Sequence, residues 1–236
     1  MKKKGRLNMT VLLPPLGNAL KVVVAIAVVS GCAGTQAVSS NEAEVSDAEA
    51  RRFLTPEETP DLAAILPTYR EVVAADEADR AYFERTRKLA GGERWSLALN
   101  DDNYSQVAIM ADYSCAIGVK LTPENVPLTS RLVAMASTDA AMASDVAKEH
   151  YERPRPFLAN EGPICLERSA RLEASFDYPS GHSSAGWMAG LVLAELAPDR
   201  ATQIMTRSRA YAESRAVCGV HNRSSTVAGH TVGSVV

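Results

Sequence analysis

The sequence has 236 residues, with 25 lysines and arginines against 28 aspartates and glutamates and a net charge of −3. This length suits one domain with a sizeable core. The charge balance and the absence of a basic stripe exclude the usual pattern of nucleic-acid-binding proteins, so we expect no nucleic-acid partner.

Residues 1–31 have the pattern of a secretory signal. Four of the first six residues are basic, an apolar run follows from Val22 to Val29, and the stretch has no acidic residue. The run is shorter than the roughly 20 apolar residues that span a bilayer. We therefore expect an exported protein whose mature part has 20 basic and 28 acidic residues, a net charge of −8.

The apolar run ends at Cys32, after Val29-Ser30-Gly31. This resembles a lipoprotein signal, in which cleavage precedes the cysteine and its thiol is lipidated. The alternative is an ordinary signal peptide cut between Ala33 and Ala37. Lipidation of Cys32 would anchor a periplasmic protein to the outer membrane, because Ala33 rather than aspartate follows it, as in Gram-negative sorting. We expect no other membrane contact.

Three further cysteines, Cys115, Cys165 and Cys218, belong to the exported part. In an oxidising compartment, one disulfide and one thiol is the simplest arrangement for an odd number. The spacing does not determine the pairing, and we take Cys165 with Cys218 as a working assignment. The Cys and His spacings do not resemble a zinc site.

Residues 32–60 are polar and acidic and are predicted to form a flexible tether. From residue 61 onward the chain is rich in Ala, Leu, Met, Glu and Arg, which are good helix formers, and it lacks long alternating runs of β-branched residues. We therefore predict that residues 61–236 form one all-α domain, a compact helical bundle.

Caps and helix breakers divide this domain. The predicted helices cover residues 76–89, 103–116, 122–151, 180–197 and 198–217, with a short last helix from 221. Glycines stop the first two helices, Thr122-Pro123 caps the third, and Pro154 and Pro156 end it. Residues 157–179 are predicted to form a loop.

Two cations lie near the end of the third predicted helix. Lys148 and Arg155 are seven residues apart, close to two helical turns, so they can project from one face. Each of them alone is more often a solvated surface charge.

Pro179-Ser180-Gly181-His182 is a more specific pattern. Ser180 occupies the position of a helix N-cap, where free N–H groups and the positive end of the helix dipole favour an anion. The alternative is an ordinary helix start with an exposed histidine. Small residues follow, which predicts a closely packed helix: Ser183, Ser184, Ala185, Gly186, Ala189 and Gly190.

The third candidate element is Ser214-Arg215-x5-His221. Arg215 lies near a predicted helix end, Gly219 breaks the helix, and His221 begins the next one. Ser225 follows four residues later, so it can share a helix face with His221. A lone histidine is more often structural than catalytic.

Together, Lys148-x6-Arg155-Pro156, Pro179-Ser180-Gly181-His182 and Ser214-Arg215-x5-His221 resemble the three-part signature of the type-2 phosphatidic acid phosphatase superfamily. That superfamily includes bacterial class A non-specific acid phosphatases and vanadium haloperoxidases. The resemblance covers residues 62–236 and is closest to the class A enzymes, through Tyr178-Pro179-Ser180-Gly181-His182 and Cys218-Gly219-Val220-His221.

The resemblance implies an acid phosphatase that hydrolyses small phosphate monoesters through a phosphohistidine. Its phosphate-binding groups would be Lys148, Arg155, Ser180, Gly181 and Arg215. His221 would attack phosphorus and His182 would protonate the leaving group, which suits mildly acidic pH. Since guanidinium and ammonium groups supply the positive charge, we expect no metal and no cofactor.

The sequence departs from the family pattern at Ser225, where the family carries an aspartate that holds the nucleophilic imidazole in its correct tautomer. A serine hydroxyl carries no charge, and by analogy with a serine-protease triad the loss of rate is up to about 10⁴. On this argument Ser225→Asp raises kcat by about tenfold or more.

Two alternatives remain open at this point. A vanadium haloperoxidase would hold vanadate in the same pocket, although this chain is short for that class. A non-enzyme, a phosphate-binding lipoprotein disabled at Ser225, would bind phosphate without turnover. We do not expect a phosphatase embedded in the membrane, because no spanning segment follows the signal.

Overall fold

A computed structural model describes residues 52–236. The predicted signal at 1–31, the lipidation site Cys32 and most of the predicted tether lie outside this part of the chain. Residues 52–236 contain helices and no strands, which confirms the all-α prediction. None of the helices within this range is long and apolar enough to cross a membrane.

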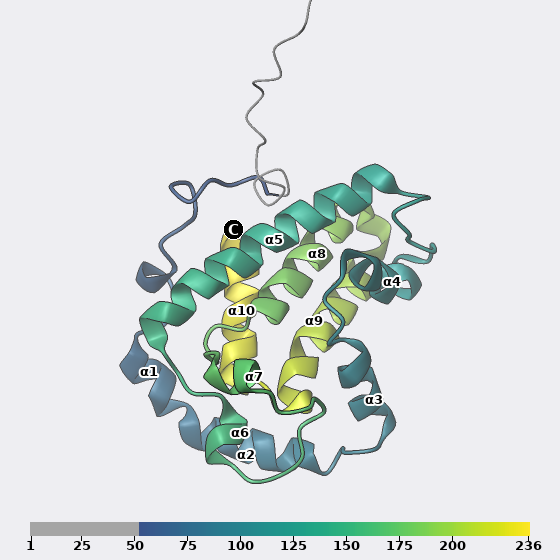
Figure 1. The fold of residues 1–236 in the computed structure, drawn as a ribbon. Helices are drawn as coiled ribbons and strands as arrows, with labels where there is room; N and C mark the ends of the chain where they lie inside the picture. Colours follow the sequence, from purple (N-terminus) through teal and green to yellow (C-terminus); the bar gives the residue numbers. More distant parts are fainter. Residues whose placement is uncertain (1–51) are drawn as a thin grey trace, which may run out of the picture. The chain divides into compact units, whose positions relative to one another are not determined.

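One helix, α8, runs through the middle of the bundle and packs against α5, α9 and α10 (Figure 1). The α-helices are α1 (Tyr69–Ala74), α2 (Asp76–Arg87), α3 (Glu93–Asn100), α4 (Gln106–Ile117), α5 (Pro127–Tyr151), α6 (Pro156–Ala159), α7 (Ala170–Ala174), α8 (Gly181–Leu196), α9 (Ala201–Cys218) and α10 (Arg223–Val235). Short 3-10 helices cover Leu62–Ala64 and Pro198–Arg200.

The small residues of α8 explain its central position. A Cβ added to Gly186 would overlap the ring of Tyr211 on α9. On α10, a Cβ at Gly229 would lie 2.6 Å from the Cβ of Ser183. Larger side chains would therefore push the neighbouring helices away, and the close packing predicted for this segment is confirmed.

Several element boundaries differ from the predicted ones. The helix predicted from Thr122 begins at Pro127, because Thr122 caps a turn in which its N–H donates to the Asn125 side chain at 2.8 Å. The predicted loop 157–179 contains the short helix α7 and part of α6. The last helix begins at Arg223, so His221 precedes it. Helices α1 and α3 were not predicted.

Residues 52–60, the end of the predicted flexible tether, lie against α5. The N–H of Phe53 donates to Asp139 Oδ2 at 2.9 Å, and Arg52 lies 3.7 Å from the same carboxylate. Asp139 is buried on α5. This part of the tether is therefore docked, because a buried carboxylate accepts its hydrogen bonds.

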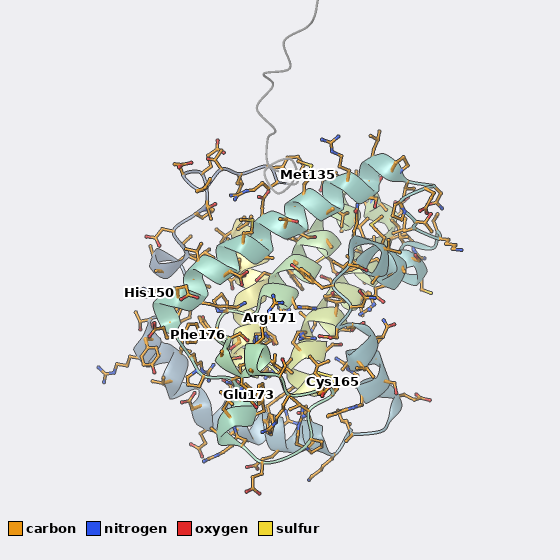
Figure 2. All side chains as sticks on the ribbon, viewed as in Figure 1. Met135, His150, Cys165, Arg171, Glu173 and Phe176 are labelled. Carbon is orange, nitrogen blue, oxygen red and sulfur yellow. A yellow bond between two sulfur atoms is a disulfide. The ribbon has the colours of Figure 1, made fainter. Side chains whose placement is uncertain are left out.

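A disulfide joins Cys165 to Cys218, which confirms the working assignment. Cys165 lies close to the carboxyl end of α9 (Figure 2). Cys115 is an exposed free thiol. The disulfide ties the segment before α7 to the end of α9, between Arg215 and His221.

Candidate active site

A cavity of about 620 Å³ lies beside the amino end of α8. Side chains from α5, α8 and α9 and from the segments around α7 and α10 line it. Six of the predicted site residues share this cavity: Lys148, Arg155, Gly181, His182, Arg215 and His221. The structure therefore brings together groups that are separated by more than 70 positions of sequence.

His221 is buried at the base of the cavity, between α9 and α10. Its Nδ1 lies 2.7 Å from the carbonyl oxygen of Asp177. Because a carbonyl oxygen only accepts, Nδ1 carries the hydrogen and Nε2 keeps its lone pair. Burial and the nearby charge of Arg155 lower the pKa of His221 to about 3, so the imidazole is neutral at mildly acidic pH.

Arg155 is fixed next to this nitrogen. Its Nη1 donates to the carbonyl of Val220 at 2.7 Å and lies 3.2 Å from His221 Nε2. Its Nε donates to the Ser175 hydroxyl at 2.9 Å. Burial lowers the pKa of Arg155 to about 10, which still leaves the guanidinium charged.

Two further cations of the cavity, Arg215 and Lys148, are each paired with a carboxylate. Arg215 Nη1 lies 2.6 Å from Asp102 Oδ1, and Lys148 Nζ lies 2.7 Å from Asp145 Oδ1. Arg215 is buried, and its Nε has no hydrogen-bond partner among the described residues. An anion that enters the cavity beside Arg155, Lys148 and Arg215 competes with the carboxylates of Asp102 and Asp145 for these cations.

His182 stands in the first turn of α8, on another wall. Its Nε2 lies 3.1 Å from the carbonyl oxygen of Asp102, so in the neutral ring Nε2 carries the hydrogen and Nδ1 carries the lone pair. The ring packs on Tyr104 with 4.4 Å between centroids. Burial and the charge of Arg215 hold the pKa of His182 well below its usual value.

Ser180 lies at the amino end of α8, and its predicted role in phosphate binding stays a prediction. It is the N-cap of α8 and is fully buried, and its hydroxyl accepts hydrogen bonds from the N–H and the hydroxyl of Ser183, at 3.4 and 2.9 Å. Gly181 lines the cavity, whereas Ser180 does not. The serine therefore shapes the helix end behind the cavity and leaves the cavity wall to the backbone of Gly181.

Ser225 is not the hydrogen-bond partner of His221, which corrects the prediction made from the family pattern. Because α10 begins only at Arg223, the two residues do not share a helix face. The carboxylate next to the imidazole belongs to Asp177, whose Oδ1 lies 3.0 Å from His221 Nδ1. Ser225 donates to Asp177 Oδ2 at 2.6 Å.

Asp177 was missed by the sequence argument, although it stands directly before Tyr178-Pro179-Ser180-Gly181-His182. It is fully buried and also accepts from the N–H and side chain of Asn222, at 3.0 and 2.8 Å. Burial by itself would raise the pKa of Asp177, but the hydrogen bond from His221 and the charge of Arg153 outweigh it and lower the pKa. The carboxylate is therefore ionised.

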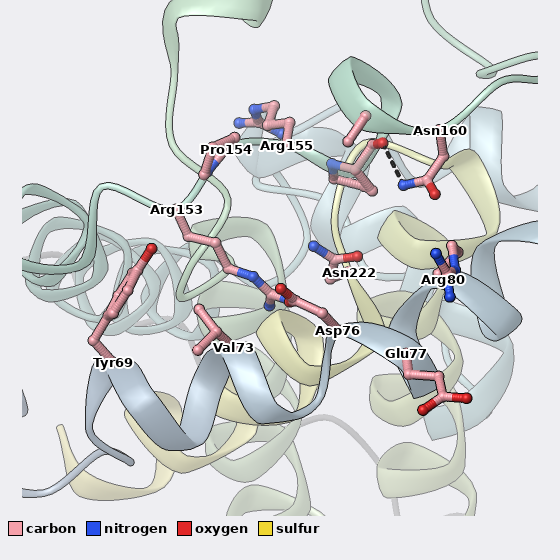
Figure 3. Close-up of a pocket in the computed structure, with 12 residues that line it drawn as sticks. Tyr69, Val73, Asp76, Glu77, Arg80, Arg153, Pro154, Arg155, Asn160 and Asn222 are labelled. Carbon is pink, nitrogen blue, oxygen red and sulfur yellow. Dashed lines mark hydrogen bonds and ion pairs between the residues drawn. The ribbon is translucent and has the colours of Figure 1, made fainter.

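Arg153 supports this carboxylate from the side away from His221. Its Nη1 lies 3.3 Å from Asp177 Oδ2, and its Nη2 lies 2.5 Å from Asp76 and 2.9 Å from Asp79. Figure 3 shows Arg153 reaching Asp76, with Asn222 beside them, at the wall of a neighbouring pocket. A buried chain of charges thus runs from α2 to the imidazole.

Comparison with known proteins finds a family match in the second half of the sequence. A match to the PAP2 superfamily spans residues 127–236, which include all six residues that share the cavity. Residues 127–236 are therefore similar in sequence to the PAP2 superfamily.

Two curated relatives extend this result. The chain is 37% identical over 157 residues to the acid phosphatase of Zymomonas mobilis, covering 66% of this chain and 60% of that protein. It is 34% identical over 157 residues to the non-specific acid phosphatase of Salmonella typhimurium, covering 66% and 62%. The chain thus spans about three fifths of the length of these relatives.

A solved structure is also similar, that of a transmembrane PAP2 type phosphatidylglycerolphosphate phosphatase from Bacillus subtilis. It is 19% identical, with a TM-score of 0.48, and the similarity covers 73% of this chain and 85% of that one.

Proposed function

We propose that this protein is an exported acid phosphatase that hydrolyses small phosphate monoesters through a phosphohistidine on His221. The observation that carries the proposal is the lone pair on His221 Nε2, which lies beside Arg155 in a cavity that also holds Lys148 and Arg215. The names of the two curated relatives support the same activity.

The three cations would bind the phosphoryl oxygens, together with the N–H of Gly181, and would neutralise charge that grows in the transition state. Because guanidinium and ammonium groups supply this charge, the reaction should need no metal and no cofactor. Arg155 is held by Ser175 and Val220, so its guanidinium is oriented before the substrate arrives.

In the first step, Nε2 of His221 forms a bond to phosphorus while the bond to the leaving oxygen breaks. His182 gives its Nδ1 proton to that oxygen. In the second step, water attacks phosphorus, the P–N bond breaks, and His182 takes the proton of the water. Phosphate leaves and both imidazoles return to their starting states.

The two steps need His221 neutral and His182 protonated. The pKa of about 3 keeps His221 neutral at mildly acidic pH. In the empty cavity, burial and the charges of Arg215 and Lys148 lower the pKa of His182. A bound phosphate monoester would offset those charges and raise the pKa of His182, so the substrate itself would promote protonation of the acid.

The test is hydrolysis of p-nitrophenyl phosphate between about pH 5 and 7 in EDTA, with acid-labile phosphoenzyme trapped and mapped by mass spectrometry. We expect turnover and a phosphoryl group on His221. Activity lost in EDTA and restored by Zn²⁺ or Mg²⁺ would contradict the metal-independent mechanism. Phosphate binding without turnover would favour the non-enzyme, and bromide oxidation with added vanadate would favour a haloperoxidase.

The location of the enzyme needs a separate experiment. We expect the wild-type protein in the outer-membrane fraction and Cys32→Ala in the soluble periplasmic fraction. A wild-type protein found wholly in the soluble periplasm would reject the lipid anchor while leaving export in place.

A further inference from the structure

We propose that Asp177 is the positioning carboxylate of His221. We also propose that the aspartate at 177 and the serine at 225 can exchange positions with little loss of activity. In this pair, position 177 supplies the negative charge that the acid phosphatase pattern places at 225, and position 225 supplies the hydroxyl. The inference rests on the phosphohistidine mechanism proposed above.

The two side chains meet on the same side of the imidazole. Asp177 Oδ1 lies 3.0 Å from His221 Nδ1, and Ser225 Oγ lies 2.6 Å from the other carboxylate oxygen. Ser225 is therefore separated from the imidazole by the width of one carboxylate. An aspartate at 225, with a serine at 177, would place its carboxylate in the space that the Asp177 carboxylate now fills.

The backbone of Asp177 and its side chain have separate tasks. The carbonyl oxygen accepts from Nδ1 at 2.7 Å, so the tautomer is held by the main chain whatever side chain stands at 177. The carboxylate adds negative charge in a site where Asp177, Ser225 and His221 are all buried, so solvent screens it little. That charge matters when His221 becomes a phosphorylated imidazolium.

The neighbours of Asp177 are arranged to keep it ionised and in place. Asn222 donates twice, Ser225 donates once, and Arg153 provides a positive charge 3.3 Å away. Ser225 thus acts on His221 only through Asp177. Each of these groups donates to a carboxylate, so a neutral amide at 177 would turn an N–H group toward donors.

The geometry reverses the expected effect of Ser225→Asp. With Asp177 present, a second carboxylate would stand in direct contact with the first, and one of the two would have to take up a proton. The substitution should therefore lower kcat, whereas the family pattern alone predicts an increase. A decrease in the kcat of Ser225→Asp supports the role of Asp177, whereas an increase supports the family pattern.

The experiment compares wild type with Asp177→Ser, Ser225→Asp and the double exchange, measuring kcat, KM and the inhibition constant of phosphate. Asp199→Ser is the matched control, since it removes an exposed carboxylate away from the cavity. All proteins are checked for folding by circular dichroism and melting temperature. Two-dimensional ¹⁵N NMR of wild type and Asp177→Ser reports which nitrogen of His221 carries the hydrogen.

We expect Asp177→Ser to lower kcat by about tenfold to thirtyfold, the difference between a charged and a neutral hydrogen bond. KM and phosphate inhibition should change by less than about threefold, because the three cations remain. The double exchange should recover kcat to within about threefold of wild type, while the control is unchanged. In NMR, His221 should keep its hydrogen on Nδ1, with the Nδ1–H signal shifted in Asp177→Ser.

A folded Asp177→Ser with wild-type kcat would overturn the proposal, as would a folded double exchange that is no more active than Asp177→Ser. If Asp177→Ser does not fold, a folded double exchange with kcat below about a hundredth of wild type overturns it. If neither variant folds, the proposal is overturned by an NMR spectrum that places the hydrogen of wild-type His221 on Nε2. A wild type without turnover, in contrast, refutes the proposed function itself.

Discussion

The two histidines of the cavity occupy contrasting environments. His221 lies between α9 and α10 and is held by a buried carboxylate and the carbonyl of Asp177. His182 lies at the start of α8, is held by the neutral carbonyl of Asp102 and packs against the tilted ring of Tyr104. The hydrogen bonds place the hydrogen on Nδ1 in one ring and on Nε2 in the other, so each ring offers a different nitrogen to the cavity.

The difference shows how one residue type serves two purposes. A negative charge beside Nδ1 stabilises a cationic ring, which a phosphohistidine requires. A neutral carbonyl on the other histidine leaves its protonation to the ligand, because the nearby Arg215 opposes a positive charge until an anion binds. The contrast supports the proposal that His221 is the nucleophile and His182 the acid.

The largest expected effect comes from removing the nucleophile. His221→Ala should lower kcat by about 10⁴ or more, because no other group in the cavity replaces the attacking nitrogen. Phosphate should still bind with an affinity within about threefold of wild type, since Lys148, Arg155 and Arg215 remain. Steady-state kinetics, phosphate inhibition and the loss of the trapped phosphoenzyme measure this.

An active His221→Ala that still forms a phosphoenzyme would assign the nucleophile elsewhere. His150→Gln is the control, because His150 is an exposed histidine of α5 outside the cavity. That variant should keep wild-type kcat.

Removing the acid should have a smaller effect that depends on the leaving group. His182→Gln should lower kcat by about 10² to 10⁴ for an alkyl phosphate, whose leaving oxygen needs a proton. For p-nitrophenyl phosphate the loss should be much smaller, because nitrophenolate leaves without one. Equal losses for both substrates would indicate that His182 binds phosphate and does not act as the acid.

Most of the cavity could be predicted from sequence because the motifs are local. Lys148, Arg155, Gly181, His182, Arg215 and His221 follow from three short patterns, and the cap at Ser180 follows from the same rules. The central place of α8 follows from its small residues, since only a closely packed helix tolerates them throughout. Such features depend on neighbours in sequence.

The partner of His221 could not be predicted in this way. Asp177 and His221 are 44 residues apart, and their contact depends on how the segment after α7 passes the end of α9. The helical spacing from His221 to Ser225 was misleading, because the helix begins after Asn222. Asparagine is a favoured N-cap, so Asn222 was the available signal for that later start.

The pH dependence of kcat/KM should separate the two histidines. His221, with a pKa of about 3, is neutral throughout the mildly acidic range and should add no acidic limb above about pH 4. The protonated fraction of His182 falls as pH rises above its lowered pKa, so kcat/KM should fall by up to about tenfold per pH unit. Profiles corrected for the second ionisation of the substrate measure this.

That limb should be absent from the profile of His182→Gln, while the profile of His150→Gln should match wild type. A limb that persists in His182→Gln would mean that another group supplies the proton.

The smallest effect concerns His230, which shows that a lowered pKa alone does not mark a catalytic histidine. It lies on α10 outside the cavity, stacks on Trp187 at 4.2 Å, and its Nε2 is buried with no partner among residues 52–236. Burial lowers its pKa to about 4. Between that value and the usual value of about 6.5, the unfolded chain binds more protons than the folded one, so the free energy of unfolding falls as pH falls.

His230→Phe keeps the stacking on Trp187 and removes this titration. Because the ring is partly exposed, we expect its share of the acid loss to be about 1 kcal/mol, or about 2 to 4 °C in a domain of this size. The drop in melting temperature from pH 6.5 to 4.5 should therefore be smaller in His230→Phe by that amount, with kcat unchanged. The lowered pKa of His221 also makes the free energy of unfolding fall as pH falls. Because His221 remains in the variant, part of the drop in melting temperature should persist. A variant with the full wild-type drop in melting temperature would show that His230 is already solvated or paired. Burial would then not be shown to lower the pKa of a histidine in this protein. The contrast between the two cavity histidines would rest on their hydrogen bonds alone.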